Sequence, residues 1–158
     1  MTLHTAARAA LCAWQPPDDD QAELRDEYIR YLDTHPDGVR RTSRPGHLTG
    51  SLIILNDVRA GSQAHEAPDQ VLLVLHGKID AWVQPGGHCE AEDRSLAETA
   101  LREGREETGL VALELLSPHP VRLSRHAAPC GARTHYDVQY AAVAAPGANP
   151  VVSAESRD

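Results

Sequence analysis

Residues 86–110 read GGHCEAEDRSLAETALREGREETGL, a stretch that joins a double-glycine turn to a helix with an acidic end. Ser95 and Glu98 have the spacing of a capping box, which predicts that the helix begins at or near Ser95. Gly109 predicts where it ends, because glycine readily adopts the left-handed conformation that follows many helices. The stretch therefore predicts one helix that begins beside a glycine turn and carries its acids at the far end.

Three glutamates of this helix fall on one face. Glu103, Glu106 and Glu107 stand at i, i+3 and i+4, the spacing that makes helical side chains neighbours. At a helix C-terminus the macrodipole disfavours each anion by about 0.3–1 kcal/mol. A solvated acidic surface is the ordinary explanation, but Gly86 and Gly87 allow a backbone carbonyl to approach an ion closely. Carboxylate and carbonyl oxygens suit Mg²⁺ or Mn²⁺, so the stretch predicts a divalent-cation site.

Residues 87–110 resemble the Nudix box, Gly-x5-Glu-x7-Arg-Glu-U-x-Glu-Glu-x-Gly-U, where U is an aliphatic residue. The matching positions are Gly87, Arg102, Glu103, Glu106, Glu107, Gly109 and Leu110. Asp93 stands in place of the first Glu, and eight residues rather than seven separate it from Arg102. Gly104 takes the aliphatic position after Arg-Glu. The first two departures fall in the loop that enters the helix, and Gly104 is expected to mark a close packing contact.

The resemblance extends over roughly residues 46–145 and implies both a fold and an activity. The implied fold is an α+β Nudix-type α/β/α sandwich with a mixed sheet. The implied activity is a pyrophosphohydrolase, which hydrolyses a nucleoside diphosphate linked to another moiety through attack of water at phosphorus. The expected partner is therefore a small-molecule diphosphate.

The resemblance also implies roles for the residues of the box. Mg²⁺ or Mn²⁺ would be bound by Glu103, Glu106 and Glu107 together with the carbonyl of Gly86. The catalytic group would be Glu103, Glu106 and Arg102, with a glutamate as the general base and Arg102 as a brace that orients an acid. Which glutamate is the base stays open.

The first forty residues predict a helical hairpin. Residues 3–14 form one candidate helix, which Pro16-Pro17 ends, and Asp18 can cap a second helix with an apolar stripe. We therefore divide the chain into an N-terminal helical appendage, 1–40, and a Nudix domain, 41–158. Many relatives continue with a further strand and helix, so the domain closes as a shorter fold, is completed by a partner subunit such as a second copy, or is truncated.

The remainder alternates strands and turns around the box helix. Candidate strands lie at 48–55, 71–76, 79–84, 111–116, 121–124 and 135–144. The strand at 71–76 is expected to be largely buried. No internal repeat appears.

Composition limits the class of protein. The formal charge of −8 argues against a nucleic-acid surface. Three widely spaced cysteines do not form a disulfide framework, and no signal peptide or membrane span is evident, so we expect a reduced cytoplasmic protein.

Further candidates for substrate binding lie outside the box helix. His88 follows the double glycine, Asp137 opens the last long strand, and Arg125 borders the loop 126–133. We expect His88 and Arg125 to contact substrate, and Asp137 to bind substrate or to support the metal or the base. Trp82 could stack on a base, but a core or edge position is the stronger expectation.

Several histidines concentrate in the β-rich part, beside two of the cysteines. Together with Cys89 and Cys130 they could suggest a zinc site, but the spacings do not match a compact zinc finger; the histidines are His47, His76, His88, His126 and His135. The sequence therefore does not predict a zinc site.

Two other functions stay open beside the nucleotide hydrolase. One is a non-catalytic Nudix-fold binder that senses a nucleotide, although the retained glutamates argue against it. The other is a hydrolase of a non-nucleotide diphosphate, such as a prenyl or inositol compound.

Overall fold

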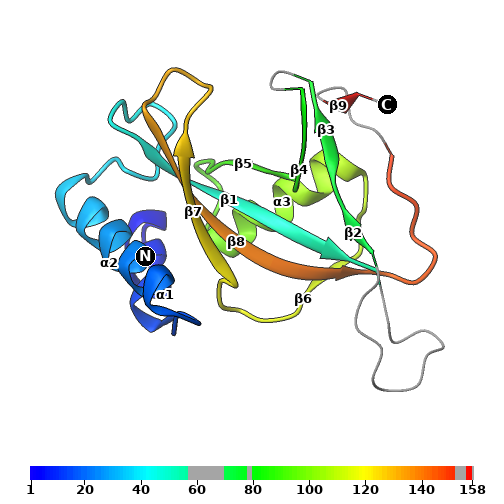
Figure 1. The fold of residues 1–158 in the computed structure, drawn as a ribbon, viewed down its shortest axis with the longest axis horizontal. Helices are drawn as coiled ribbons and strands as arrows, with labels where there is room; N and C mark the ends of the chain where they lie inside the picture. Colours follow the sequence, from blue (N-terminus) through cyan, green and yellow to red (C-terminus); the bar gives the residue numbers. More distant parts are fainter. Residues whose placement is uncertain (57–69, 78–79, 152–155, 158) are drawn as a thin grey trace.

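A computed structural model describes residues 1–56, 70–77, 80–151 and 156–157 (Figure 1). Two helices, α1 (Leu3–Ala13) and α2 (Asp19–Thr34), come first, and α3 (Leu96–Thr108) lies between strands in the sequence. The strands are β1 (His47–Leu55), β2 (Val71–Leu72), β3 (Val74–His76), β4 (Ala81–Val83), β5 (Gly86–His88), β6 (Leu113–Leu115), β7 (Arg122–Ala127), β8 (Thr134–Ala144) and β9 (Ser156–Arg157). The predicted α+β class and the N-terminal helical hairpin are confirmed.

The centre of the main sheet is a parallel pair, β1 and β8. His47 lies opposite His135 at one end, and Leu55 lies opposite Val143 at the other. Strands β2 and β5 add antiparallel to β1, and β6 and β7 add antiparallel to β8, which gives a six-stranded mixed sheet. A second sheet has the order β4-β3-β9. The mixed sheet agrees with the prediction.

The predicted strand at 71–76 is split between the two sheets. Val71 and Leu72 pair with β1, whereas Val74 to His76 pair with β4. The expectation that this strand is largely buried is wrong, since Val71 is 50% exposed and Leu73 is 42% exposed. The chain passes from one sheet to the other at Leu73, and each short piece keeps one face in solvent.

Helix α3 packs directly on β1 because a glycine removes the side chain between them. A Cβ atom added to Gly50 would lie 2.9 Å from the carbonyl oxygen of Leu96 and 3.1 Å from the backbone nitrogen of Ala100. One added to Gly104 would lie 2.7 Å from Cδ2 of Leu52. The close contact expected at Gly104 is therefore present, and its neighbour is the end of a side chain.

These two glycines are expected to differ in how far alanine destabilises the protein. Gly50→Ala is expected to lower the free energy of unfolding by about 1–3 kcal/mol, because helix backbone would have to move. Gly104→Ala is the matched control. There the Leu52 side chain can yield, and alanine regains about 1 kcal/mol of helix propensity, so the two effects offset. Urea denaturation measures both, and an equal loss in the two variants would contradict the backbone contact at Gly50.

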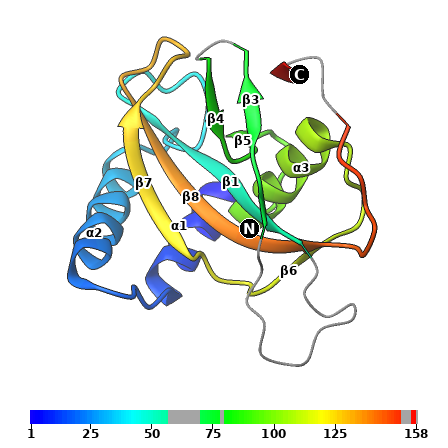
Figure 2. The same cartoon turned by 45° about the vertical axis from the view of Figure 1, so that its right-hand side comes forward.

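The helical hairpin is hydrogen-bonded to β7 and β8. Gln21 donates from Nε2 to the Leu123 carbonyl at 3.2 Å and accepts from the Leu123 N–H at 2.7 Å. The hydroxyl of Tyr28 donates to the carbonyls of Ser124, at 2.8 Å, and Asp137, at 3.1 Å. Figure 2 shows both helices beside these strands. Buried residues of the hairpin, such as Leu11 and Tyr28, belong to the same hydrophobic core as the strands and α3.

Tyr28→Phe tests this docking. Loss of the hydroxyl leaves two buried carbonyls without this donor and is expected to lower the free energy of unfolding by about 1–2 kcal/mol. Arg8→Ala is the control, because Arg8 pairs with Asp33 between side chains that are 42% and 46% exposed. That exposed pair is expected to contribute about 0–1 kcal/mol. Thermal and urea unfolding that rank the variants in the reverse order would contradict the docking role.

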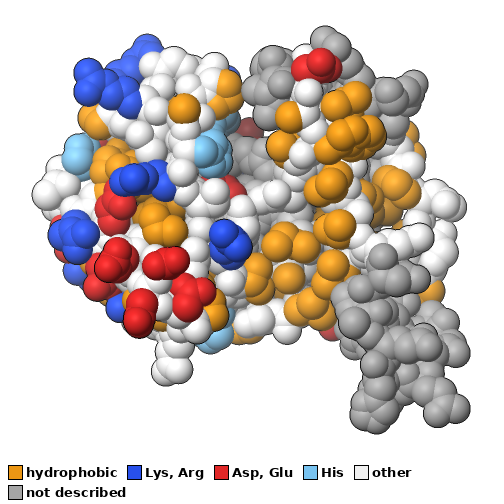
Figure 3. Space-filling view, in the orientation of Figure 1, with side chains coloured by type: hydrophobic (Ala, Val, Ile, Leu, Met, Phe, Trp, Pro, Cys, Tyr) orange, Lys and Arg blue, Asp and Glu red, His pale blue; other side chains and the backbone are white. Residues whose placement is uncertain are grey.

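The two faces of the central strand pair differ in polarity. Leu48, Leu52, Val138 and Tyr140 face the common core. The alternate positions carry buried polar side chains, here called the polar face: His47, Thr49 and Ser51 on β1, and His135, Asp137 and Gln139 on β8. Figure 3 shows the surface hollowed between β7 and the β3–β4 hairpin. Within the described part of the chain, no helix is both long and apolar enough to cross a membrane.

Candidate active site

Helix α3 has the ends that the sequence predicts. The hydroxyl of Ser95 accepts a hydrogen bond from the Glu98 N–H at 3.1 Å, and Gly109 adopts a left-handed conformation with φ of 68°. The Glu98 carboxylate does not complete a capping box with Ser95 but accepts from the Arg94 N–H at 2.9 Å. These caps fix where the three glutamates fall along the helix.

Arg102 is the centre of a network of ion pairs beneath the glutamates. Its Nη1 donates to Oε1 of Glu103 at 3.0 Å and to Oε2 of Glu106 at 2.9 Å. Its Nη2 donates to the carbonyl of His88 at 2.7 Å. The side chain of Arg102 is 20% exposed, so most of this network lies away from solvent. One guanidinium therefore fixes two acids and the end of β5 together.

Asp93 completes the network despite the extra residue in the loop. Arg102 donates to its two oxygens, from Nε at 3.2 Å and from Nη2 at 3.1 Å. Asp93 also accepts from the Glu90 N–H and from the hydroxyl of Thr99, both at 2.9 Å. The loop thus accommodates the added residue and the shorter acid, and Asp93 still reaches the arginine.

The glycine turn lies against two of the glutamates, Glu107 and Glu103. The Gly86 N–H donates to Oε2 of Glu107 at 3.0 Å. A Cβ atom added to Gly87 would lie 2.6 Å from Cδ of Glu103. Only glycine leaves room for this carboxylate against β5. The structure therefore places Glu103 and Glu107 against the glycine turn, at the contact between α3 and β5.

The charges at this contact do not balance. Four carboxylates, those of Glu90, Asp93, Glu103 and Glu106, pair with the single guanidinium of Arg102. Burial raises the pKa of Glu103, although Arg102 opposes the shift. The donors are hard oxygens, and a divalent cation would offset the excess negative charge. The residues present therefore fit Mg²⁺ or Mn²⁺.

Asp137 lies buried on the polar face, next to the glycine turn. It accepts from the hydroxyls of Thr49, at 2.8 Å, and Ser51, at 2.6 Å, and from Nε2 of Gln139 at 3.2 Å. Burial raises its pKa, and these donors oppose the shift. Ser51 in turn pairs with Gly86 across β1 and β5. The sequence predicted Asp137 alone; the alternating polar residues in two otherwise apolar strands were the signal for the others.

Three other candidates lie apart from the glutamates. Arg125 forms an ion pair with Glu27 of α2. Trp82 is 62% exposed on β4, an edge strand of the second sheet, so of the expected core or edge position it takes the edge. The imidazole of His88 lies 5.0 Å from that of His47 between ring centroids, whereas its backbone carbonyl binds Arg102. A role for these side chains in substrate binding stays a prediction.

Comparison with known proteins identifies the family. The NUDIX domain family matches residues 58–157. A *C. elegans* Ap4A hydrolase in a binary complex is 17% identical, with a TM-score of 0.56 over 70% of this chain and 75% of that chain. A NUDIX-family hydrolase from *Clostridium perfringens* is 24% identical, with a TM-score of 0.55 over 70% and 77% of the two chains.

A third similar structure is the NUDIX domain of *Shewanella oneidensis* NrtR complexed with ADP ribose. It is 22% identical, with a TM-score of 0.50 over 75% of this chain and 73% of that chain. The sequences of curated proteins give no match. The fold, the box helix with its braced glutamates and the family match agree, and the chain belongs to the Nudix family of hydrolases.

Proposed function

We propose that this protein is a divalent-metal-dependent pyrophosphohydrolase that acts on a nucleoside diphosphate linked to another moiety. The observation that carries the proposal is the arrangement of Glu103, Glu106 and Glu107 around the glycine turn, with Arg102 bonded to two of them. A purely structural acidic helix end has no need of an arginine brace that lies mostly away from solvent.

The residues of this site have separate roles in the proposed hydrolysis. Mg²⁺ or Mn²⁺ bound by Glu103, Glu106, Glu107 and the Gly86 carbonyl would neutralise the diphosphate and lower the pKa of a bound water. Glu103 or Glu106 would accept the proton of that water as it attacks phosphorus. Arg102 holds both acids in place throughout, so positioning contributes to the rate.

The substrate would lie over the polar face, in the hollow beside the β3–β4 hairpin (Figure 3). Trp82 on β4 of this hairpin is 62% exposed and could stack on a base. The similar structures named above include an Ap4A hydrolase and a domain bound to ADP ribose. Both compounds contain adenosine phosphates, so they are the first substrates to test.

A turnover assay tests the proposal. The protein with Mg²⁺ is offered Ap4A, ADP-ribose, other nucleoside diphosphate derivatives, and prenyl and inositol diphosphates in water labelled with ¹⁸O. We expect cleavage of a nucleoside compound, with the label on one phosphorus in the product. Cleavage of only a prenyl or inositol compound would identify the non-nucleotide hydrolase instead. Tight binding without turnover would identify a nucleotide-sensing binder.

We further propose a reducing, cytoplasmic setting and a homodimer. Cys12, Cys89 and Cys130 are all free thiols, which agrees with a reducing compartment. Light scattering of the purified protein measures its mass, and the mass of one chain would contradict the dimer.

A further inference from the structure

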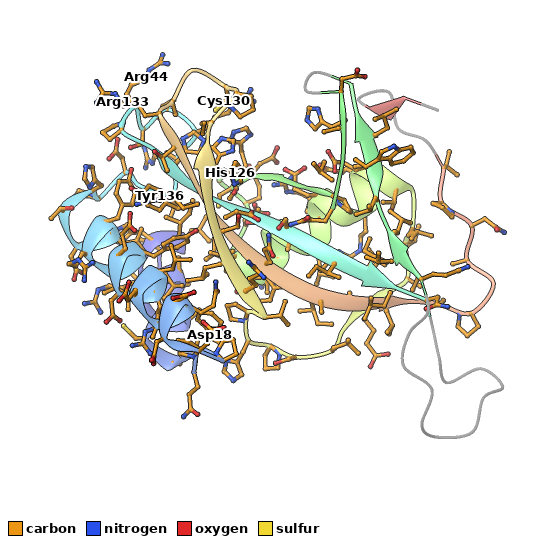
Figure 4. The ribbon with its side chains drawn as sticks, in the orientation of Figure 1. Asp18, Arg44, His126, Cys130, Arg133 and Tyr136 are labelled. Carbon is orange, nitrogen blue, oxygen red and sulfur yellow. The ribbon has the colours of Figure 1, made fainter. Side chains whose placement is uncertain are left out.

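A second cluster of potential ligands lies on the polar face, beside the glutamate site. Its members come from four segments of the chain: β1, β5, the loop between β7 and β8, and the start of β8. They are His47, His88, Cys130 and His135, and one ligand atom from each lies within 4.8 Å of all the others. Figure 4 shows Cys130 on the loop that joins β7 to β8, with His126 nearby.

Two distances in this cluster are close to those of a metal site. Sγ of Cys130 lies 3.6 Å from Nε2 of His47 and 3.2 Å from Nε2 of His135. Tetrahedral zinc with Zn–S of about 2.3 Å and Zn–N of about 2.0–2.1 Å separates sulfur from nitrogen by about 3.6 Å. The ring centroids of the three histidines lie 4.9 to 5.2 Å apart. Small side-chain movements would complete a tetrahedron.

The orientation of the rings also suits a metal. Nδ1 of His47 lies 3.3 Å from the carbonyl of Ser43, so Nε2 is the nitrogen directed at Cys130. An outer hydrogen bond of this kind fixes the tautomer of a metal-bound histidine. Burial lowers the pKa of His47, and burial together with the neighbouring imidazoles lowers that of His135 to about 3. Both rings are thus neutral at pH 7, the form that binds metal.

Hydrogen bonding makes little use of the ligand atoms in the cluster. The thiol of Cys130 can donate its one proton to one imidazole nitrogen and its sulfur can accept from the other, but a thiol is a weak partner in both roles. A cation at the centre would let the thiolate and the imidazole nitrogens all act as ligands.

We propose that His47, His88, Cys130 and His135 bind one zinc ion. Three imidazoles and a thiolate favour zinc over Mg²⁺, which prefers oxygen ligands. Four protein ligands fill a tetrahedral shell and leave no position for water, so the site is structural. This role replaces the substrate contact that the sequence suggested for His88.

The site would act on the catalytic centre through β5. The side chain of His88 faces the zinc ligands, while its carbonyl accepts the 2.7 Å hydrogen bond from Arg102. Two residues earlier, the Gly86 N–H binds Glu107. Zinc would therefore hold the strand on which both the arginine brace and a metal-binding glutamate depend. The zinc proposal itself does not require the hydrolase proposal.

Metal content is the first test. The protein is purified without a histidine tag, loaded with Zn²⁺, dialysed against buffer containing Mg²⁺, and measured by plasma mass spectrometry. We expect about one zinc ion per chain. Exchange with Co²⁺ should give the intense visible bands of a tetrahedral site and a thiolate charge-transfer band. Zinc well below one ion per chain after loading, or a cobalt spectrum without the thiolate band, would overturn the proposal.

Two cysteine variants locate the site. A changed second-shell contact already costs about 10–100-fold in metal affinity, so Cys130→Ser is expected to cost more than that. Cys89→Ser is the matched control, because Cys89 adjoins His88 but its thiol donates to the Leu48 carbonyl at 3.6 Å. Equal zinc binding by Cys130→Ser and the natural protein would contradict the assignment.

A measurement on the natural protein covers the case in which Cys130→Ser does not fold. A thiol reagent followed by peptide mass spectrometry should modify Cys130 slowly with zinc bound and quickly after a chelator. If Cys130 reacted at the same rate with and without zinc, the assignment would be overturned. Glu107→Gln separates the two metal sites, since it should lose Mg²⁺-dependent turnover and keep its zinc.

Discussion

Glu107→Gln is expected to lower turnover by at least about tenfold, and a loss of 10²–10⁴-fold would match removal of a group central to proton transfer or metal binding. Glutamine keeps the size of the side chain and an oxygen that can accept the Gly86 N–H. The substitution therefore removes a charge and leaves the fold of the turn in place. Turnover is measured across a Mg²⁺ titration, and the melting temperature should change little.

Glu98→Gln provides the matched control on the same helix. Glu98 binds Arg94 near the start of α3, away from the glutamates at its end, so turnover should stay at the natural level. Full activity of Glu107→Gln with unchanged metal dependence would remove Glu107 from the metal site. A fall of equal size in the two variants would point to the helix as a whole and not to the carboxylate.

Arg102→Ala is expected to lower both stability and turnover. It leaves Asp93, which is 6% exposed at its side chain, and Glu103, which is 15% exposed, without their cation. Breaking a buried ion pair costs about 3–5 kcal/mol, and the lower figure fits because Arg102 is partly exposed. Displacement of Glu103 and Glu106 should lower turnover by about 100-fold.

Arg94→Ala is the comparison for this prediction. Arg94 also pairs with a glutamate of α3, but its side chain is 86% exposed, so its loss should cost about 0–1 kcal/mol. Urea unfolding and steady-state kinetics on both variants measure the difference. If the two arginines proved equally important for stability, the network around Arg102 would not be the brace described above.

The local features of the site could be predicted from the sequence. Ser95 and Gly109 determine the ends of α3 by chemistry that acts within a few residues, and the i, i+3, i+4 spacing then places the glutamates. The hairpin of α1 and α2 follows likewise from a proline break and the cap at Asp18. Each of these depends on contacts between near neighbours in the chain.

The long-range features could not be predicted in this way. The sequence did not predict the proposed zinc site, because the spacing criterion for a zinc finger applies to ligands within one short segment. His47 lies far in the sequence from Cys130 and His135. The parallel register of β1 and β8 sets His47 opposite His135 although they are far apart in sequence. Likewise, the sequence around Leu73 does not indicate that the chain changes sheets there, since the residues before and after it are apolar. Register and sheet membership depend on partners that a local pattern does not identify.

The parallel pairing of β1 with β8 has a consequence for how the protein folds. Thr49 and Asp137, hydrogen-bonded at the centre of the sheet, are separated by 88 positions. Such a contact requires closure of a long loop before any of its energy is gained, which slows folding compared with a chain of local contacts. During synthesis β1 is made well before β8, its partner at the centre of the sheet, and the glycine turn and α3 are made between them. A nascent chain halted before residue 134 would therefore expose an unpaired edge of β1, a surface for chaperones or for aggregation.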